Sequence, residues 1–223
     1  RTEIDAVLET QRAAGIDYTI LMPPPNIFPD NASICETTQG HSNVIKFAAV
    51  NPRLGLPALA EMEKLNKEWG FKGIKLTPPK HGYQIAEKFL HPFFEKAIEL
   101  GMVVTIHSGQ EQCYPGDISL VAMQFPQLPI IMDHMGYRYH CREAILASKF
   151  NPNLFLATTA VSEPRFFIEA VDSLGPTKLM FGSNCPLIPP DIQIELIKRA
   201  KLSKKDEELV RGGNALRVLG IEG

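Results

Sequence analysis

The sequence predicts a (β/α)8 TIM barrel of which this chain carries seven strands. Seven short apolar runs alternate with longer segments that have apolar residues at helical spacing, the pattern of a parallel sheet with both faces covered. The glycine-rich phosphate-binding motifs of open parallel sheets do not occur. Polar residues instead follow several strands at their C-terminal ends, as in a barrel that builds its active site there.

The seven predicted strands are short and rich in β-branched or large apolar residues. In chain order they cover residues 17–22, 45–50, 73–76, 102–107, 129–134, 153–158 and 178–182. Because consecutive parallel strands end at the same edge of a sheet, we expect the polar groups at these strand ends to lie close together.

Four of the intervening segments predict amphipathic helices, at residues 4–14, 57–69, 92–100 and 164–174. In the first of them Ile4, Val7 and Leu8 lie at i, i+3 and i+4 and so share one face. Each of the other three begins with a proline, and all four are followed by a glycine, which is how helices commonly start and end.

The order of the elements predicts where the barrel is incomplete. A helix leads into the first predicted strand, so we expect the missing strand to precede Arg1 and a gap or a foreign strand to lie beside residues 17–22. Residues 23–41 form the longest irregular stretch and are expected to be a functional loop or a surface cover. No break in composition marks a second domain, and residues 1–223 are expected to form one barrel domain.

Composition excludes several classes of protein. The 23 basic and 25 acidic residues give a net charge of −2, which argues against a nucleic-acid partner. No apolar stretch is long enough to span a membrane. The four cysteines are scattered without a C-x-x-C pair, so we expect reduced thiols in a cytoplasmic protein rather than disulfides or a cysteine zinc site. A small molecule is the expected partner, and the long loops leave a homodimer open.

Two histidines end consecutive predicted strands. His107 shares one strand face with Val103 and Thr105, and His134 closes its own strand in the same way. A glycine follows each histidine within two residues and allows a sharp turn beside a ligand. The pair predicts a metal ligand together with a catalytic or second ligand histidine. The alternative is a pair of polar plugs at the rim of the barrel.

Further polar residues lie at or beyond the strand ends. Asn51, Lys75 and Thr158 are candidates for substrate binding. Arg138 could bind a substrate carboxylate through its planar fork, or could be a surface residue. Asn184 offers a neutral carbonyl oxygen and an amide donor but cannot act as a general base, and it could equally be a turn residue before Cys185-Pro186.

Six short stretches occur in a characteristic order: residues 50–52 (Val-Asn-Pro), 70–76 (Gly-Phe-Lys-Gly-Ile-Lys-Leu), 106–109 (Ile-His-Ser-Gly), 133–136 (Asp-His-Met-Gly), 181–186 (Phe-Gly-Ser-Asn-Cys-Pro) and 213–217 (Gly-Asn-Ala-Leu-Arg). With this ordered set the chain resembles the amidohydrolase-related family of metal-dependent hydrolases and decarboxylases. The resemblance implies that His107 is a metal ligand and that His134 is a ligand or a catalytic residue near the substrate. The position of Asn184 implies a catalytic role, but family members normally carry a metal-binding aspartate there.

The resemblance also implies a function and a cofactor. The expected activity is hydrolysis of a small organic amide, ester or lactone, assisted by a divalent metal, with zinc expected when the site is complete. Asn184 and the missing His-x-His of the first strand favour decarboxylation, a metal-independent lactonase or a non-catalytic binding barrel as alternatives. With these two departures, this chain is expected to be metal-free or only partly occupied.

Overall fold

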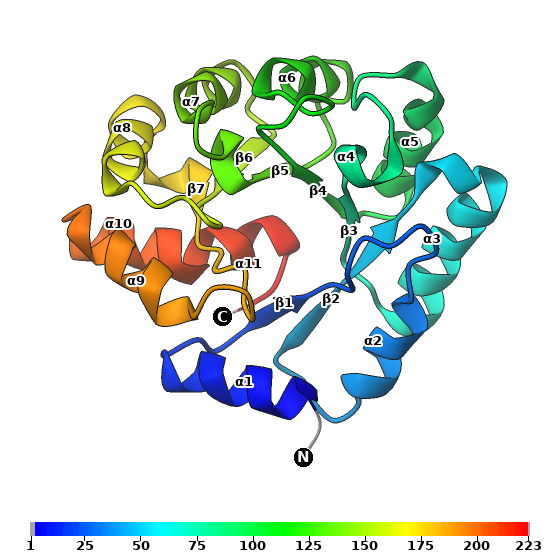
Figure 1. The fold of residues 1–223 in the computed structure, drawn as a ribbon, viewed down its shortest axis with the longest axis horizontal. Helices are drawn as coiled ribbons and strands as arrows, with labels where there is room; N and C mark the ends of the chain where they lie inside the picture. Colours follow the sequence, from blue (N-terminus) through cyan, green and yellow to red (C-terminus); the bar gives the residue numbers. More distant parts are fainter. Residues whose placement is uncertain (1–2, 223) are drawn as a thin grey trace.

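The structure is a computed structural model that describes residues 3–222, and it contains seven parallel strands in one curved sheet (Figure 1). The strands follow one another around the sheet in chain order, each paired with the next. Their bounds are β1 Thr19–Leu21, β2 Val44–Val50, β3 Gly73–Leu76, β4 Val103–His107, β5 Ile130–Asp133, β6 Leu154–Ala157 and β7 Leu179–Met180.

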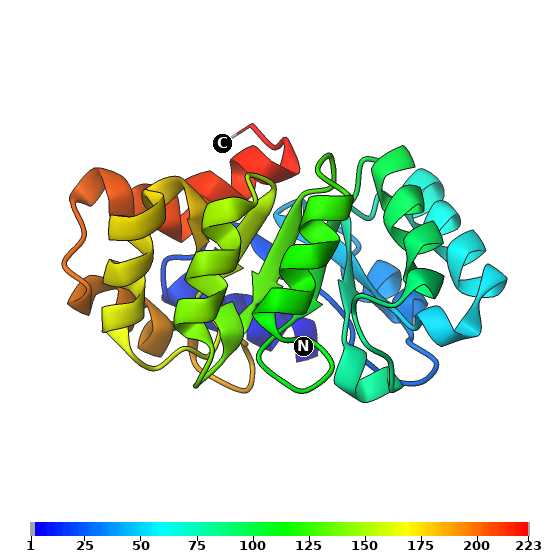
Figure 2. The same cartoon turned by 90° about the horizontal axis from the view of Figure 1, so that it is seen from above.

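The helices of the described chain are α1 Glu3–Ala13, α2 Asn31–Thr37, α3 Leu56–Trp69, α4 Pro78–His81, α5 His91–Glu99, α6 Pro115–Gln124, α7 Cys141–Phe150, α8 Pro164–Leu174, α9 Pro190–Arg199, α10 Lys204–Glu208 and α11 Asn214–Leu219. Most of them cover the outer face of the sheet, and Figure 2 shows several standing side by side along it. Val218 and Leu219 of α11 instead pack against apolar residues of the inner face. Among the described residues no helix is long and apolar enough to cross a membrane.

Each of the seven predicted strands and four predicted helices has its counterpart in the structure. The expectation of an irregular segment over residues 23–41 is wrong in part, because α2 lies within it. Asp30 caps this helix by accepting a hydrogen bond from the Ser33 N–H at 3.1 Å. The side chain of Asn31 bonds both backbone groups of Ala49, at 3.0 and 2.9 Å, and so ties the helix to β2.

The strands alternate between an inner and an outer face. The inner residues form their own apolar cluster, which includes Phe47, Val103, Ile131 and Phe155, whereas the outer residues pack beneath the helices. Gly73 makes room for the Phe47 ring, since a Cβ at this glycine would lie 2.4 Å from a ring carbon. The inner face is therefore filled by side chains below the site, as in a packed barrel.

The sheet is open between β1 and β7. Within the described chain β1 pairs only with β2, and β7 pairs only with β6. A cleft of about 600 Å³ lies between these two edge strands, and Ile16, Ile20, Ile45, Phe181, Ile194 and Leu216 are among the residues that line it. The architecture is that of a (β/α)8 barrel lacking one strand, and the expected gap beside β1 is confirmed.

Candidate metal and catalytic site

Three charged or titratable side chains face the barrel interior at the C-terminal ends of β3, β4 and β5. Lys75 lies two residues beyond Gly73, His107 two residues beyond Thr105, and Asp133 two residues beyond Ile131, so each continues the inner face of its strand. His107 and Asp133 are also direct partners in the register of β4 and β5. Strand alternation and register together place these groups at one rim.

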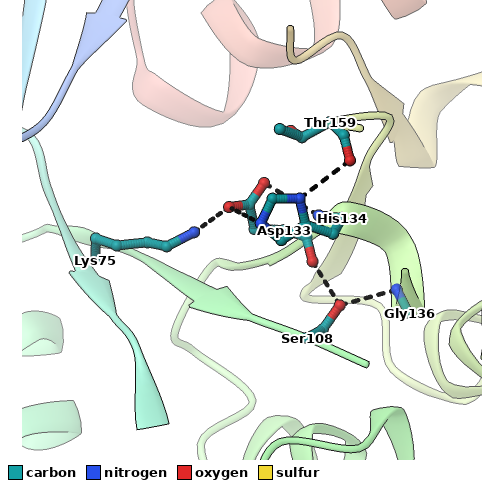
Figure 3. A network of polar contacts seen from close by, with 6 residues as sticks. All are labelled: Lys75, Ser108, Asp133, His134, Gly136 and Thr159. Atoms are coloured by element: carbon teal, nitrogen blue, oxygen red, sulfur yellow. Dashed lines mark hydrogen bonds and ion pairs between the residues drawn. The ribbon is translucent and has the colours of Figure 1, made fainter. Parts of the chain in front are cut away.

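Asp133 is the centre of the polar network shown in Figure 3. Its Oδ2 atom forms an ion pair with the Lys75 ammonium, and its Oδ1 atom accepts a hydrogen bond from the His134 N–H at 3.0 Å. Burial acts to raise the pKa of the Asp133 carboxyl, but Lys75, His134 and a hydrogen bond from Thr159 outweigh it and hold the pKa well below its usual range. Asp133 is therefore ionised and neutralised by Lys75.

His134 reaches this site by a route that differs from the predicted one. The strand β5 ends at Asp133, and on strict alternation His134 would face the helices. His134 instead takes a left-handed φ of 63° at the start of a 3-10 turn, His134–Gly136. This turn brings its Nδ1 atom to 3.1 Å from the Thr159 carbonyl oxygen and its Nε2 atom to 3.3 Å from Asp133 Oδ2. The expectation that His134 closes its strand as His107 does is thus wrong in geometry.

The turn after β5 is held against the turn after β4. The Ser108 hydroxyl donates to the Asp133 carbonyl and accepts from the Gly136 N–H at 2.8 Å. Gly109 has a φ of +83°, and a Cβ there would lie 2.3 Å from the Gly136 carbonyl oxygen. The two predicted glycine turns are therefore packed backbone against backbone, and this contact fixes where His134 stands.

The two imidazoles lie edge to face, with ring centroids 4.7 Å apart and planes at 73°. Burial, with His134 and Lys75 nearby, lowers the pKa of His107 to about 4. Burial also lowers the pKa of His134, although Asp133 acts in the opposite direction. Both rings are neutral at pH 7 and have lone pairs to offer. The expected convergence of His107 and His134 on one site is borne out.

The donor set fits a divalent metal. One ligand atom each from His107, Asp133 and His134 lies within 4.8 Å of the other two. The Thr159 carbonyl can only accept a hydrogen bond, so the hydrogen of His134 is on Nδ1 and Nε2 keeps its lone pair. Two acceptor atoms, Nε2 of His134 and Oδ2 of Asp133, then face each other. Because their lone pairs repel, a cation or a proton beside them stabilises the arrangement. Nitrogen and carboxylate donors of this kind suit zinc and manganese.

Two predicted substrate-binding residues have structural contacts. Asn51 donates to the Ile27 carbonyl at 2.8 Å and accepts from the Arg53 N–H at 3.1 Å, which holds the loop after β1. The buried Thr158 hydroxyl accepts from the Gly182 N–H at 3.2 Å and joins the ends of β6 and β7. Of the predicted substrate-binding residues, all of them within the described chain, Lys75 alone bonds to a residue of the His107–Asp133–His134 group, through its ion pair with Asp133.

The remaining two predicted residues lie in loops. Arg138 is exposed, with its guanidinium 5.4 Å from the centroid of the Tyr137 ring. Asn184 is half-buried after β7 with a left-handed φ of 67°, and its carbonyl accepts from the Ile188 N–H at 3.2 Å. Asparagine is among the residues that tolerate this conformation, so the turn alternative is supported, and a role toward metal or substrate stays a prediction.

Sequence reasoning did not select Asp133 or Thr159 as site residues. A signal for Asp133 was present, because alternation from Ile131 puts Asp133 rather than His134 on the inner face. For Thr159 no local signal exists, since its carbonyl and hydroxyl meet the site only through the fold.

Comparisons with known proteins agree with this architecture. A family model described as amidohydrolase matches residues 3–221. Among solved structures, 5-carboxyvanillate decarboxylase from Sphingomonas paucimobilis is 18% identical with a TM-score of 0.79, covering 96% of this chain and 82% of that one. A dihydroxybenzoic acid decarboxylase from a Polaromonas species, with bound manganese and an inhibitor, is 17% identical with a TM-score of 0.76, covering 99% and 86%. A third solved structure, 4-oxalomesaconate hydratase from Rhodopseudomonas palustris, is 21% identical with a TM-score of 0.75, covering 97% of this chain and 80% of that one. No curated protein sequence matches the chain significantly.

At these identities the structural likeness concerns the fold, whereas the family match spans almost the whole chain. The His107–Asp133–His134 cluster of this chain offers the ligand atoms of a divalent-metal site. His107 and His134, which two of the ordered motifs contain, lie together in this cluster. The chain belongs to the amidohydrolase family and is one of its enzymes.

Proposed function

We propose that this enzyme is a metal-assisted decarboxylase of a small aromatic hydroxy acid. The observation that carries the proposal is the charge state of the cluster. Lys75 neutralises Asp133, the single carboxylate of the described metal-ligand group, while two neutral imidazoles lie beside it. The neighbours named as decarboxylases support the same reaction.

Hydrolysis, the activity first expected from the sequence, requires a general base rather than a proton donor. A base must take the proton of the attacking water, and in this family that base is normally the aspartate at the position of Asn184. Asn184 cannot accept that proton, and the Asp133 carboxylate already binds a cation, either the Lys75 ammonium or the metal that replaces it. Decarboxylation needs a proton delivered to carbon instead, which an imidazole can do.

The proposed step breaks the bond between the ring carbon and the carboxylate carbon. Carbon dioxide leaves, and the ring carbon keeps the electron pair and takes up one proton, which comes from solvent by way of His134. Thr159 orients this imidazole so that Nε2 is the atom available to hold the proton. Because the pKa of His134 is lowered, the protonated imidazole is a stronger acid and gives up its proton readily.

The metal and the proton cannot share Nε2 of His134. We therefore assign the metal to His107 and Asp133 and keep His134 for the proton. A divalent metal bound there would supply positive charge to hold the carboxylate and neighbouring hydroxyl of the substrate. Zinc remains the expected ion from the resemblance, and manganese is an equal candidate from the donor set. A cytoplasmic homodimer that takes a small-molecule substrate completes the proposal.

The test is a substrate panel on the metal-loaded enzyme. Dihydroxybenzoates and 5-carboxyvanillate are incubated with the manganese and zinc forms, and released carbon dioxide is measured. In D2O the product should also gain deuterium at the ring carbon that lost its carboxylate. A parallel panel of lactones, esters and amides tests hydrolysis. Hydrolysis of that panel without any carbon dioxide release would replace the proposal with the hydrolase alternative.

Variants separate the assigned roles. His134→Gln should reduce decarboxylation about 10²–10⁴-fold while leaving metal content nearly unchanged, because it removes the proton donor and no assigned ligand. His107→Gln and Asp133→Asn should lower metal content itself. Equal loss of metal in all three variants would mean that His134 is a ligand and that another group moves the proton.

A further inference from the structure

We propose that Lys75 is a built-in competitor of the metal: its ammonium occupies the cation position on Asp133 when no metal is bound, and a divalent ion must displace it. This inference rests on the metal site of the proposed function. It adds a residue that sets the affinity of that site, and it predicts that binding a metal releases Lys75.

The competition is for one oxygen atom. Asp133 Oδ1 is already used by the N–H of His134 at 3.0 Å, which leaves Oδ2 as the atom free for a cation. The Lys75 Nζ atom contacts this same Oδ2, and His134 Nε2 approaches it to 3.3 Å (Figure 3). A metal bound through Oδ2 would therefore meet the ammonium at the position that the ammonium now holds.

Burial makes the competition strong. The Lys75 side chain is 9% exposed and the Asp133 side chain 13% exposed, so water screens the pair poorly. Lys75 also starts from a strand, with its backbone paired to β2 at Ala49 and to β4 at Thr105. The ammonium can swing only by rotating its own side chain, and after displacement it stays close enough to repel a divalent ion.

Net charge leads to the same conclusion. The charges of the Lys75 ammonium and the Asp133 carboxylate sum to zero, so a divalent ion that enters the site meets a carboxylate that is already compensated. Removing the ammonium would leave the site with one negative charge and a free Oδ2 atom. Hard divalent cations bind more tightly when a charged oxygen donor is uncompensated. A lysine at this place therefore weakens the site without being a ligand.

The experiment measures Mn²⁺ affinity by the electron paramagnetic resonance signal of the free ion. Lys75→Met keeps the apolar stem and removes the charge, and we expect it to bind Mn²⁺ about tenfold more tightly or better. Lys72→Met is the matched control, because it makes the same charge change at an exposed position of the same β3 region. We expect the control to bind like the unaltered protein. Asp133→Asn in the Lys75→Met background should abolish the gain.

A second measurement uses the unaltered protein and does not depend on how a variant folds. Lysine acylation with an N-hydroxysuccinimide ester, read by mass spectrometry, should modify Lys75 slowly in the metal-free protein and several-fold faster when Mn²⁺ is bound. Lys72 should be acylated equally in both states. Faster labelling that is specific to Lys75 would show that the metal releases it.

The outcomes separate this inference from the proposed function. Weaker or unchanged Mn²⁺ binding by Lys75→Met, with Asp133→Asn still lowering affinity, would overturn the competitor role and leave the metal site standing. Acylation of Lys75 at the same rate with and without Mn²⁺ would also overturn the competitor role and leave the metal site standing. Absence of Mn²⁺ binding by both the unaltered protein and Lys75→Met would overturn the inference and the metal-assisted function together.

Discussion

The Nε2 atom of His134 lies 3.3 Å from the Oδ2 atom of Asp133, although a neutral imidazole and an ionised carboxylate both act as acceptors at these atoms. Thr159 causes this arrangement, because its carbonyl oxygen accepts a hydrogen bond from the single N–H group of the neutral ring, at Nδ1. Lys75 makes it tolerable by placing an ammonium on the same oxygen. In the proposed reaction, this arrangement lets the short segment Asp133-His134 hold a cation at Asp133 and a proton at His134.

The first prediction concerns the stability of the buried ion pair. Asp133→Asn leaves the Lys75 ammonium buried without its counter-ion, and we expect a loss of about 3–5 kcal/mol in the free energy of unfolding. The double variant Lys75→Met/Asp133→Asn should recover a large part of this loss, because no unpaired charge remains. Urea denaturation of the metal-free protein measures both, and Asp172→Asn at an exposed position serves as control. Equal stabilities of the single and double variants would contradict the explanation.

The second prediction concerns the contact between the two turns. Gly109→Ala combines a left-handed φ of +83° with a Cβ 2.3 Å from the Gly136 carbonyl oxygen, so we expect it to cost about 3 kcal/mol or more. Gly101→Ala is the matched control, because Gly101 has a φ of +62° and open space around its Cβ position. The control should cost only about 1 kcal/mol. Similar midpoints of thermal unfolding for Gly109→Ala and Gly101→Ala would show that the backbone can move to relieve the contact between residue 109 and the Gly136 carbonyl.

The third prediction is a pH dependence in the metal-free protein. The folded state lowers the pKa of His107 to about 4, whereas the unfolded chain has an ordinary imidazole. Between these two pKa values the unfolded state binds more protons, so stability falls as the pH falls. From pH 8 to pH 5 we expect His107 to account for a loss of about 2 kcal/mol.

The variant His107→Gln tests this assignment, because it removes the titrating group and keeps a polar side chain. Denaturation curves at several pH values should show a shallower decline for the variant than for the unaltered protein. His41→Gln serves as a control in a loop of the other barrel end. A decline of the same slope in all three proteins would assign the pH dependence to other groups.

The fourth prediction concerns Asn184. Asn184→Asp keeps a residue that tolerates the left-handed φ of 67° and adds a negative charge near the end of β7. If Asn184 faces the metal site, metal content should rise, and hydrolysis of lactones or esters should gain about 10²–10⁴-fold because a carboxylate can accept the proton of water. Elemental analysis and the hydrolysis panel measure the two effects. Unchanged values in both would establish Asn184 as a turn residue.

Local patterns in the sequence determined the strands, their order and the inner position of His107. Alternation within residues 103–107 was enough to place His107 inward, and Lys75 was a candidate because of its place in the third strand. The gap beside β1 followed from counting strands against a barrel. These features depend on residues close together in the chain, where period and turn chemistry act directly.

Only the tertiary structure decided which of these groups meet. Lys75 and Asp133 are 58 positions apart, and nothing local to either predicts the ion pair that neutralises the site. His134 joins Asp133 and His107 through a left-handed turn that packs against Gly109 at Gly136. Asn51 and Thr158 are occupied by backbone groups that the fold brings to them. Such contacts form when a curved sheet brings distant strand ends together, so the sequence alone determined the candidates and the folded chain determined their roles.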